Sequence, residues 1–91
     1  MAFMLNIGYG NLVPAARIVA VLQPGSAPVR RLREEAGRAG RLLDATQGRR
    51  TRALLVLDSG HLVLSAVQAQ TLAARWQGMA AGPGGEQEAG P

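Results

Sequence analysis

Residues 42–57 decide the fold of this chain, and their sequence is LLDATQGRRTRALLVL. A short apolar segment leads through a Gln-Gly pair into a cluster of three cations: Arg49, Arg50 and Arg52. The apolar run that follows the cluster is typical of a buried β-strand. We therefore expect a short strand over 42–46 and a long strand over 49–58, with the arginines at the mouth of the long strand.

The arginine cluster is a candidate contact for nucleic acid. A guanidinium group pairs bidentately with phosphate or with guanine edges, and a rigid strand end would hold it in place. Arg17 is a further candidate, because it opens another apolar strand and has no acidic neighbour in sequence. If the two strands pair in one sheet, Arg17, Arg49 and Arg50 would lie on a common rim. The alternative is that these arginines are simply a solvated strand end.

Upstream of residue 42, the sequence predicts three elements and a turn. A strand over 3–7 precedes the glycine-containing turn 8–11, and a second strand covers 17–22. An amphipathic helix follows, with Ser26 or Ala27 as its N-cap and an end at Gly40. Its apolar stripe faces away from arginines and glutamates at i, i+4 spacing. The members of the stripe are Val29, Leu32, Ala36 and Ala39.

Downstream of residue 57, Ser59 and Gly60 predict a two-residue hairpin turn. A strand over 62–67 and a short helix over 69–77 complete the body. From 78 to 91 the chain is rich in Gly, Pro and Glu, and it cannot bury enough apolar surface to offset its ordering entropy. We expect one domain over 1–77 and a disordered tail over 78–91.

These elements predict an α+β fold with a small, mostly antiparallel sheet, one amphipathic helix and a short C-terminal helix. The strands are apolar on both faces, as in a sheet that is covered on both sides. Two short helices cover about one face, so the other face should meet a second subunit or a second sheet. A chain of 91 residues is also marginal as a monomer. We expect self-association, with Leu55, Leu57 and Trp76 as interface candidates.

The charge balance suggests an anionic partner. The chain carries ten arginines and six acidic residues, a net charge of +4. Within 1–77, ten arginines face four carboxylates, so the body has a net charge of +6. Nucleic acid, an acidic protein and a membrane surface all fit this balance. The chain shows neither a signal peptide nor an apolar stretch long enough to span a membrane, and we expect a cytoplasmic protein.

Residues suited to catalysis or metal binding are few. His61 is the only histidine and there is no cysteine, so no zinc site can be built. Asp44 and Asp58 are too few for a hard-metal cage. Ser59 and His61 follow Asp58 along one turn instead of converging in a pocket, which argues against nucleophilic catalysis. The Gly8-Tyr9-Gly10 segment lacks the rest of a phosphate-loop motif and is interpreted as a tight turn. No cofactor, metal or small-molecule substrate is expected.

Several motifs resemble, in order and spacing, those of the RemA family of small bacterial regulators. The most specific is the string DATQGRRTRA at 44–53. The others are NIGYGN at 6–11, SAP at 26–28 and LSAVQ at 64–68. Together they extend from about Asn6 to Trp76, which is nearly the whole predicted body.

The resemblance implies a DNA-binding transcriptional regulator that assembles into a ring-shaped homo-oligomer. In that family DNA contact is attributed to an arginine after the Gly-aromatic-Gly-Asn segment and to the paired arginines of the Gly-Arg-Arg motif. Arg17, Arg49 and Arg50 occupy these positions, and Arg52 lies beside them. The chain departs from the pattern at Gln47, Pro14, Ala16 and Ala69, and no departure removes an arginine.

The expected partners are therefore double-stranded DNA and further copies of this chain, at the nucleoid. Two other classes stay open on the residues alone. One is an oligomeric structural or adaptor protein that binds an acidic protein, with the arginines serving subunit interfaces through Asp44 or Glu34. The other is an enzyme, which the shortage of acid, base and nucleophile candidates argues against.

Overall fold

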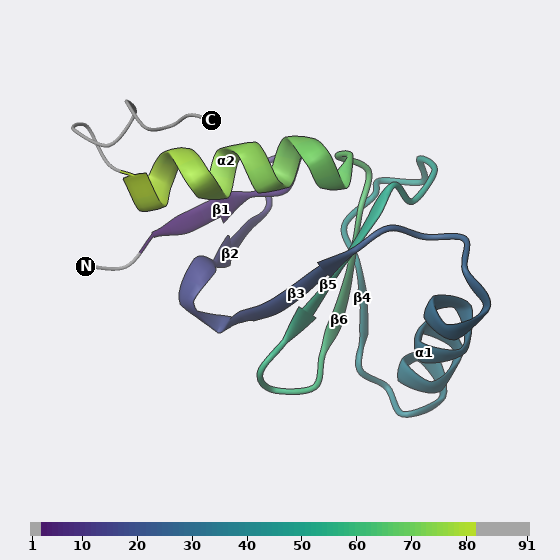
Figure 1. The fold of residues 1–91 in the computed structure, drawn as a ribbon. Coiled ribbons are helices and arrows are strands. Elements are labelled where there is room, and N and C mark those ends of the chain that lie inside the picture. Colours follow the sequence, from purple (N-terminus) through teal and green to yellow (C-terminus); the bar gives the residue numbers. More distant parts are fainter. Residues whose placement is uncertain (1–2, 82–91) are drawn as a thin grey trace.

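A computed structural model describes residues 3–81 of the chain (Figure 1). In this range the structure has a two-stranded and a four-stranded sheet, with helices on both sides of the larger one. The α+β class and the mostly antiparallel pairing predicted from the sequence are confirmed.

The chain begins with a small hairpin. Strands β1 (Met4–Asn6) and β2 (Leu12–Pro14) pair antiparallel, and Leu5 and Val13 face the interior. The turn between them has three successive residues with positive φ: 103° at Gly8, 55° at Tyr9 and 78° at Gly10. A Cβ at Gly8 would lie 3.0 Å from a methyl carbon of Val67, so this glycine also permits close packing. The tight-turn interpretation is confirmed, whereas the sequence analysis missed β2.

The larger sheet has the order β3-β5-β6-β4. Its strands are β3 (Ile18–Leu22), β4 (Leu42–Asp44), β5 (Ala53–Leu57) and β6 (Leu62–Ser65). Strand β5 pairs antiparallel with both β3 and β6, and β4 runs parallel to β6. Strands β3 and β4 are therefore the two edges. A short 3-10 helix, η1 (Ala15–Arg17), leads from the hairpin into β3.

The sheet buries apolar side chains on both faces, as predicted. On one face Leu55 and Val63 pack against the β1–β2 hairpin and helix α2 (Ala69–Ala81). On the other face Leu54 and Leu64 pack with helix α1 (Ala27–Arg38). Figure 1 shows the two helices on opposite sides of the sheet. The sequence predicted that one face would be covered by a second subunit or by a second sheet. The structure has the second sheet, because the β1–β2 hairpin of the same chain covers the face that carries Leu55 and Val63, so burial of this face requires no second subunit.

Helix α1 follows its sequence signals closely. The Ser26 hydroxyl accepts a hydrogen bond of 3.3 Å from the amide of Val29, and Pro28 lies in the first turn. Gly40, with φ of 73°, follows the end of the helix. The anticipated i, i+4 pairs between arginine and glutamate are not formed, since the ion pair within residues 3–81 is Arg17–Asp58.

Three boundaries differ from the prediction. Strand β5 begins at Ala53 and not at residue 49, because neither neighbouring strand extends further. Strand β3 ends at Leu22 and β6 ends at Ser65, and Pro24 has no amide hydrogen with which to extend the ladder. The hairpin after β5 has three loop residues, 58–60, closed by a bond from the Gly60 amide to the Leu57 carbonyl. Helix α2 continues to Ala81, past the predicted end at residue 77. The remainder of the predicted tail, 82–91, lies outside the described residues.

Candidate nucleic-acid interface

The arginine cluster lies on a short, well-anchored loop between β4 and β5. Gln47 and Gly48 have φ of 56° and 76°, and the amide of Arg49 donates to the Thr46 carbonyl at 3.0 Å. Two successive positive φ values around such a bond are typical of a type I′ turn. At the other end of the loop, the amide of Arg52 donates to the Ser65 carbonyl at 2.8 Å. The loop is thus fixed to the sheet on both sides of the three arginines.

Asp44 and Thr46 anchor the start of this loop. The Asp44 Oδ1 atom accepts from the Thr46 hydroxyl at 2.6 Å and from the Thr46 amide at 2.9 Å. These two bonds lower the pKa of Asp44 below its ordinary value of 3.8, and Arg33 adds a smaller effect in the same direction. Thr46 itself is buried. Asp44 is therefore ionised at neutral pH. Its carboxylate accepts hydrogen bonds from Thr46 and does not pair with an arginine of the cluster.

Arg49, Arg50 and Arg52 are solvent-exposed. Among residues 3–81, none of the three forms an intramolecular ion pair or side-chain hydrogen bond. Each guanidinium therefore keeps all of its donors available, and the loop carries three uncompensated positive charges within four residues.

Arg17 does not join this cluster, which corrects the expectation of a common rim. Because β3 and β5 are antiparallel, Ile18 pairs with Leu57 and Leu22 pairs with Leu54. Arg17 therefore lies beside the far end of β5, whereas Arg52 precedes its near end. The five residues of β5 are joined by four rises of about 3.3 Å, so the two ends of the strand lie about 13 Å apart.

At its own end of the sheet, Arg17 is paired with Asp58. Its Nη1 atom lies 3.2 and 3.3 Å from the two carboxylate oxygens. Both side chains remain largely exposed, at 64% and 45%. An ion pair this accessible to water is weak, so an external anion can compete for Arg17.

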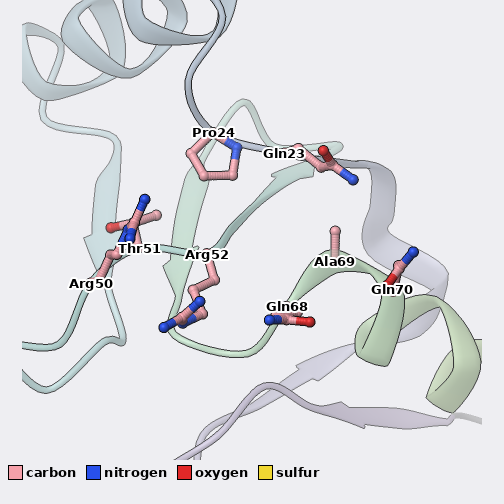
Figure 2. Close-up of a pocket in the computed structure, with 8 residues that line it drawn as sticks. All are labelled: Gln23, Pro24, Arg50, Thr51, Arg52, Gln68, Ala69 and Gln70. Atoms are coloured by element: carbon pink, nitrogen blue, oxygen red, sulfur yellow. The ribbon is translucent and has the colours of Figure 1, made fainter.

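A polar cavity of about 270 Å³ adjoins the arginine loop. Figure 2 shows Arg50, Thr51 and Arg52 on one side, the start of α2 on the other, and Gln23 with Pro24 on the segment after β3. Three glutamines of this cavity were not predicted from the sequence: Gln23, Gln68 and Gln70. The available signal was that Gln23 follows a strand and Gln68 precedes a helix, but their convergence depends on strand pairing that the sequence does not reveal.

The three interface candidates have different surroundings. Leu55 is fully buried in the core of one protomer, so the structure gives its predicted interface role no exposed side chain. Trp76 lines an apolar groove along edge strand β3, next to Val19, which is 66% exposed. Leu57 lines a second apolar groove, which extends to Leu43 on the opposite edge strand, and Leu43 is 49% exposed.

The hairpin after β5 carries the residues that were considered for nucleophilic catalysis: Asp58, Ser59 and His61. The Ser59 hydroxyl lies 2.7 Å from His61 Nδ1, while the Asp58 carboxylate faces Arg17. The three groups thus do not form a serine–histidine–aspartate relay.

Among the described side chains, no cluster of three or more potential ligands could hold a metal ion. Within residues 3–81, no helix is both long and apolar enough to cross a bilayer.

Comparisons with known proteins agree on one family. The family model described as "Extracellular matrix regulatory protein A-like" matches residues 4–76. A relative from Desulfatibacillum aliphaticivorans is 60% identical over 73 residues, which are 80% of this chain and 82% of the relative. A relative from Geobacillus kaustophilus is 51% identical over 78 residues, covering 86% and 90% of the two chains.

A relative from Dictyoglomus turgidum is 55% identical over 75 residues, which are 82% of this chain and 88% of the relative. The names of all three relatives begin with "Putative regulatory protein". The matched residues include the hairpin, the whole larger sheet, the arginine loop and most of α2. On this evidence the chain belongs to the RemA-like family of regulatory proteins.

Proposed function

We propose that this protein is a DNA-binding transcriptional regulator, without enzymatic activity, that acts as a ring-shaped homo-oligomer at the nucleoid in the cytoplasm. One observation carries the proposal: Arg49, Arg50 and Arg52 lie uncompensated on a loop that is fixed at both ends. The regulatory naming of the relatives supports the same class of function. No cofactor or small-molecule substrate takes part.

The contact with DNA is largely electrostatic. Guanidinium groups neutralise phosphates and release condensed counterions, so affinity falls linearly with salt on logarithmic axes, with a slope of about −0.9 per neutralised phosphate. Arg17 supplies a second contact point at the opposite end of the sheet, once the duplex displaces Asp58. Each protomer therefore contacts the backbone at two separate places.

A single protomer makes too few contacts for tight binding, and oligomerisation multiplies them. The two apolar grooves, one along β3 and one beside β4, lie at opposite edges of the sheet and differ in composition. Two different surfaces that dock on each other generate a head-to-tail assembly, which closes into a ring when the rotation permits. The tethered copies then act at high effective concentration along one duplex.

A comparison of two single-arginine variants tests the DNA assignment. Arg50→Ala removes one cation from the loop, and Arg31→Ala removes one from helix α1, outside the loop and its cavity. We expect Arg50→Ala to lower duplex affinity at least about tenfold and to flatten the salt dependence by about 0.9 per engaged subunit. Arg31→Ala should do neither, and both should keep the oligomer seen by native mass spectrometry. Equal affinities of Arg50→Ala and the unmodified protein would refute the assignment.

The alternative function is an oligomeric adaptor whose arginines bind an acidic protein. The Arg17–Asp58 pair is the observation in its favour, because it shows one of these cations already bound to a carboxylate. Competition separates the two functions. A regulator releases labelled duplex only to competing nucleic acid at matched ionic strength, whereas an adaptor prefers an acidic polypeptide.

A further inference from the structure

The cavity of about 270 Å³ beside the arginine loop is the feature from which a more specific contact can be inferred. Its lining comes from three separate segments: residues 23–24 after β3, residues 50–52 before β5, and residues 68–70 at the start of α2. A concave site accepts a convex part of its ligand. In a duplex the sugar–phosphate backbone forms the ridges, whereas the base edges lie on the floor of the grooves.

The lining also has the chemistry of a phosphate site. It contains two guanidinium groups and three carboxamides, and no carboxylate. Within residues 3–81, the side chains of Gln23, Gln68 and Gln70 make no intramolecular hydrogen bond, so their N–H donors are free. Glutamine amides are among the groups that contact phosphate oxygens in protein–DNA complexes.

The three segments are held in place before any ligand arrives. Gln23 follows directly on Leu22, which pairs with Leu54 in the sheet. The Gln68 carbonyl accepts from the amide of Leu72 at 3.0 Å, which fixes the start of α2. Together with the hydrogen bond of the Arg52 amide, these bonds fix the backbone around the cavity, so less conformational entropy is lost when a ligand binds.

We propose that this cavity seats one backbone phosphate of the bound duplex and that Gln23 and Gln68 hold it through uncharged hydrogen bonds, beside Arg50 and Arg52. The inference rests on the proposed function and divides its interface into two kinds of contact. The arginines supply the part of the affinity that depends on salt. The glutamines supply a part that does not, because an uncharged donor releases no counterion.

The test is a salt titration of duplex binding with the full-length oligomer and a fluorescently labelled duplex of mixed sequence. For Gln23→Ala and Gln68→Ala we expect affinity to fall about threefold to tenfold, which is the usual effect of removing one neutral hydrogen bond. The slope of log affinity against log salt should stay that of the unmodified protein. Gln68→Glu, which keeps the side-chain shape but adds a charge, should bind more weakly than Gln68→Ala.

Two controls make the outcome specific. Thr71→Ala changes a polar residue in the first turn of α2 that does not line the cavity, and it should leave both affinity and slope unchanged. Arg50→Ala should lower both. The inference is overturned if Gln23→Ala and Gln68→Ala bind like the unmodified protein, or if they flatten the slope as Arg50→Ala does. The proposed function fails separately, if Arg50→Ala itself changes nothing.

Discussion

At the scale of single residues, the arginine loop depends on backbone conformations that most residues avoid. Gln47 and Gly48 both have positive φ, and an L-residue with a Cβ pays about 1–2 kcal/mol for that conformation. Only Gly48 escapes this cost. No atom lies within 4 Å of a Cβ built at Gly48, so any penalty for substitution there comes from the backbone alone.

Two glycine-to-alanine substitutions should therefore have opposite effects on stability. Gly48→Ala should lower the free energy of unfolding by about 1 kcal/mol, because it forces a Cβ into the left-handed region. Gly78→Ala lies in α2, has no atom within 4 Å of its Cβ, and should raise that free energy by about 0.5–1 kcal/mol through helix propensity. Urea denaturation measures both. Equal effects of the two changes would contradict the turn geometry.

Asp44 makes the arginine loop sensitive to acid. Its folded pKa is lowered by the hydrogen bonds from Thr46, so the unfolded chain binds this proton more readily. The resulting stabilisation is present above the ordinary pKa of 3.8 and is lost as the pH falls through the lower folded value.

We expect Asp44→Asn to reduce the difference in unfolding free energy between pH 7 and pH 3, since its amide does not titrate. Urea denaturation of both proteins at the two pH values measures this difference. An unchanged difference would show that the Thr46 bonds do not favour the charged form of Asp44.

At the level of elements, sequence patterns predicted the strand and helix cores and the β5–β6 hairpin, but not the antiparallel pairing of β3 with β5. The stretches Ile18–Leu22 and Ala53–Leu57 were predicted as strands because apolar, branched residues fill them. Strand β2 was missed because three residues that end in proline carry almost no periodic signal. The direction of pairing, which separates Arg17 from the loop arginines, depends on contacts between residues far apart in the chain.

The candidate site was predicted in part for the same reason. The Gly-Arg-Arg motif could be identified locally, because its turn and its charges are contiguous in sequence. The cavity could not, because its glutamines come from the end of β3 and the start of α2. Likewise, the partner of Arg17 lies 41 residues away at Asp58.

The β5–β6 hairpin should restrain DNA binding through Asp58, if the proposed function holds. Asp58→Asn removes the charge that holds Arg17 but keeps the side-chain size, so Arg17 no longer has to leave a carboxylate before it meets a phosphate. We expect duplex affinity to rise about twofold to fivefold, in line with about 0.4–1 kcal/mol for an exposed ion pair. Fluorescence anisotropy at fixed salt provides the measurement. Asp58→Asn in an Arg17→Ala background should have a smaller effect.

At the level of the whole molecule, one chain covers both faces of its sheet, so the proposed homo-oligomer would have to form through the sheet edges. Val19 on β3 and Leu43 on β4 are exposed apolar residues beside the two grooves. Leu55, by contrast, belongs to the core. A charge at Leu55 should unfold the protomer, whereas a charge at either edge should leave it folded.

If the proposed head-to-tail assembly holds, two edge variants should behave as complementary halves of one junction. Val19→Asp and Leu43→Asp should each give folded monomers by light scattering and circular dichroism, because each removes one of the two complementary surfaces. A mixture of the two variants retains one intact junction, between the β4 edge of the first and the β3 edge of the second, and should form dimers. If the mixture stays monomeric, the two grooves do not dock on each other.

If the proposed function holds, arginines of residues 47–53 bind the DNA backbone repeatedly around an oligomer. A salt titration of duplex binding, run in parallel on the unmodified protein and Arg50→Ala, tests it most directly. We expect log affinity to decline steeply and linearly with log salt for the unmodified protein, and Arg50→Ala to give a weaker affinity and a flatter line at the same subunit number. Binding that does not respond to salt, or two superimposable lines, would contradict it.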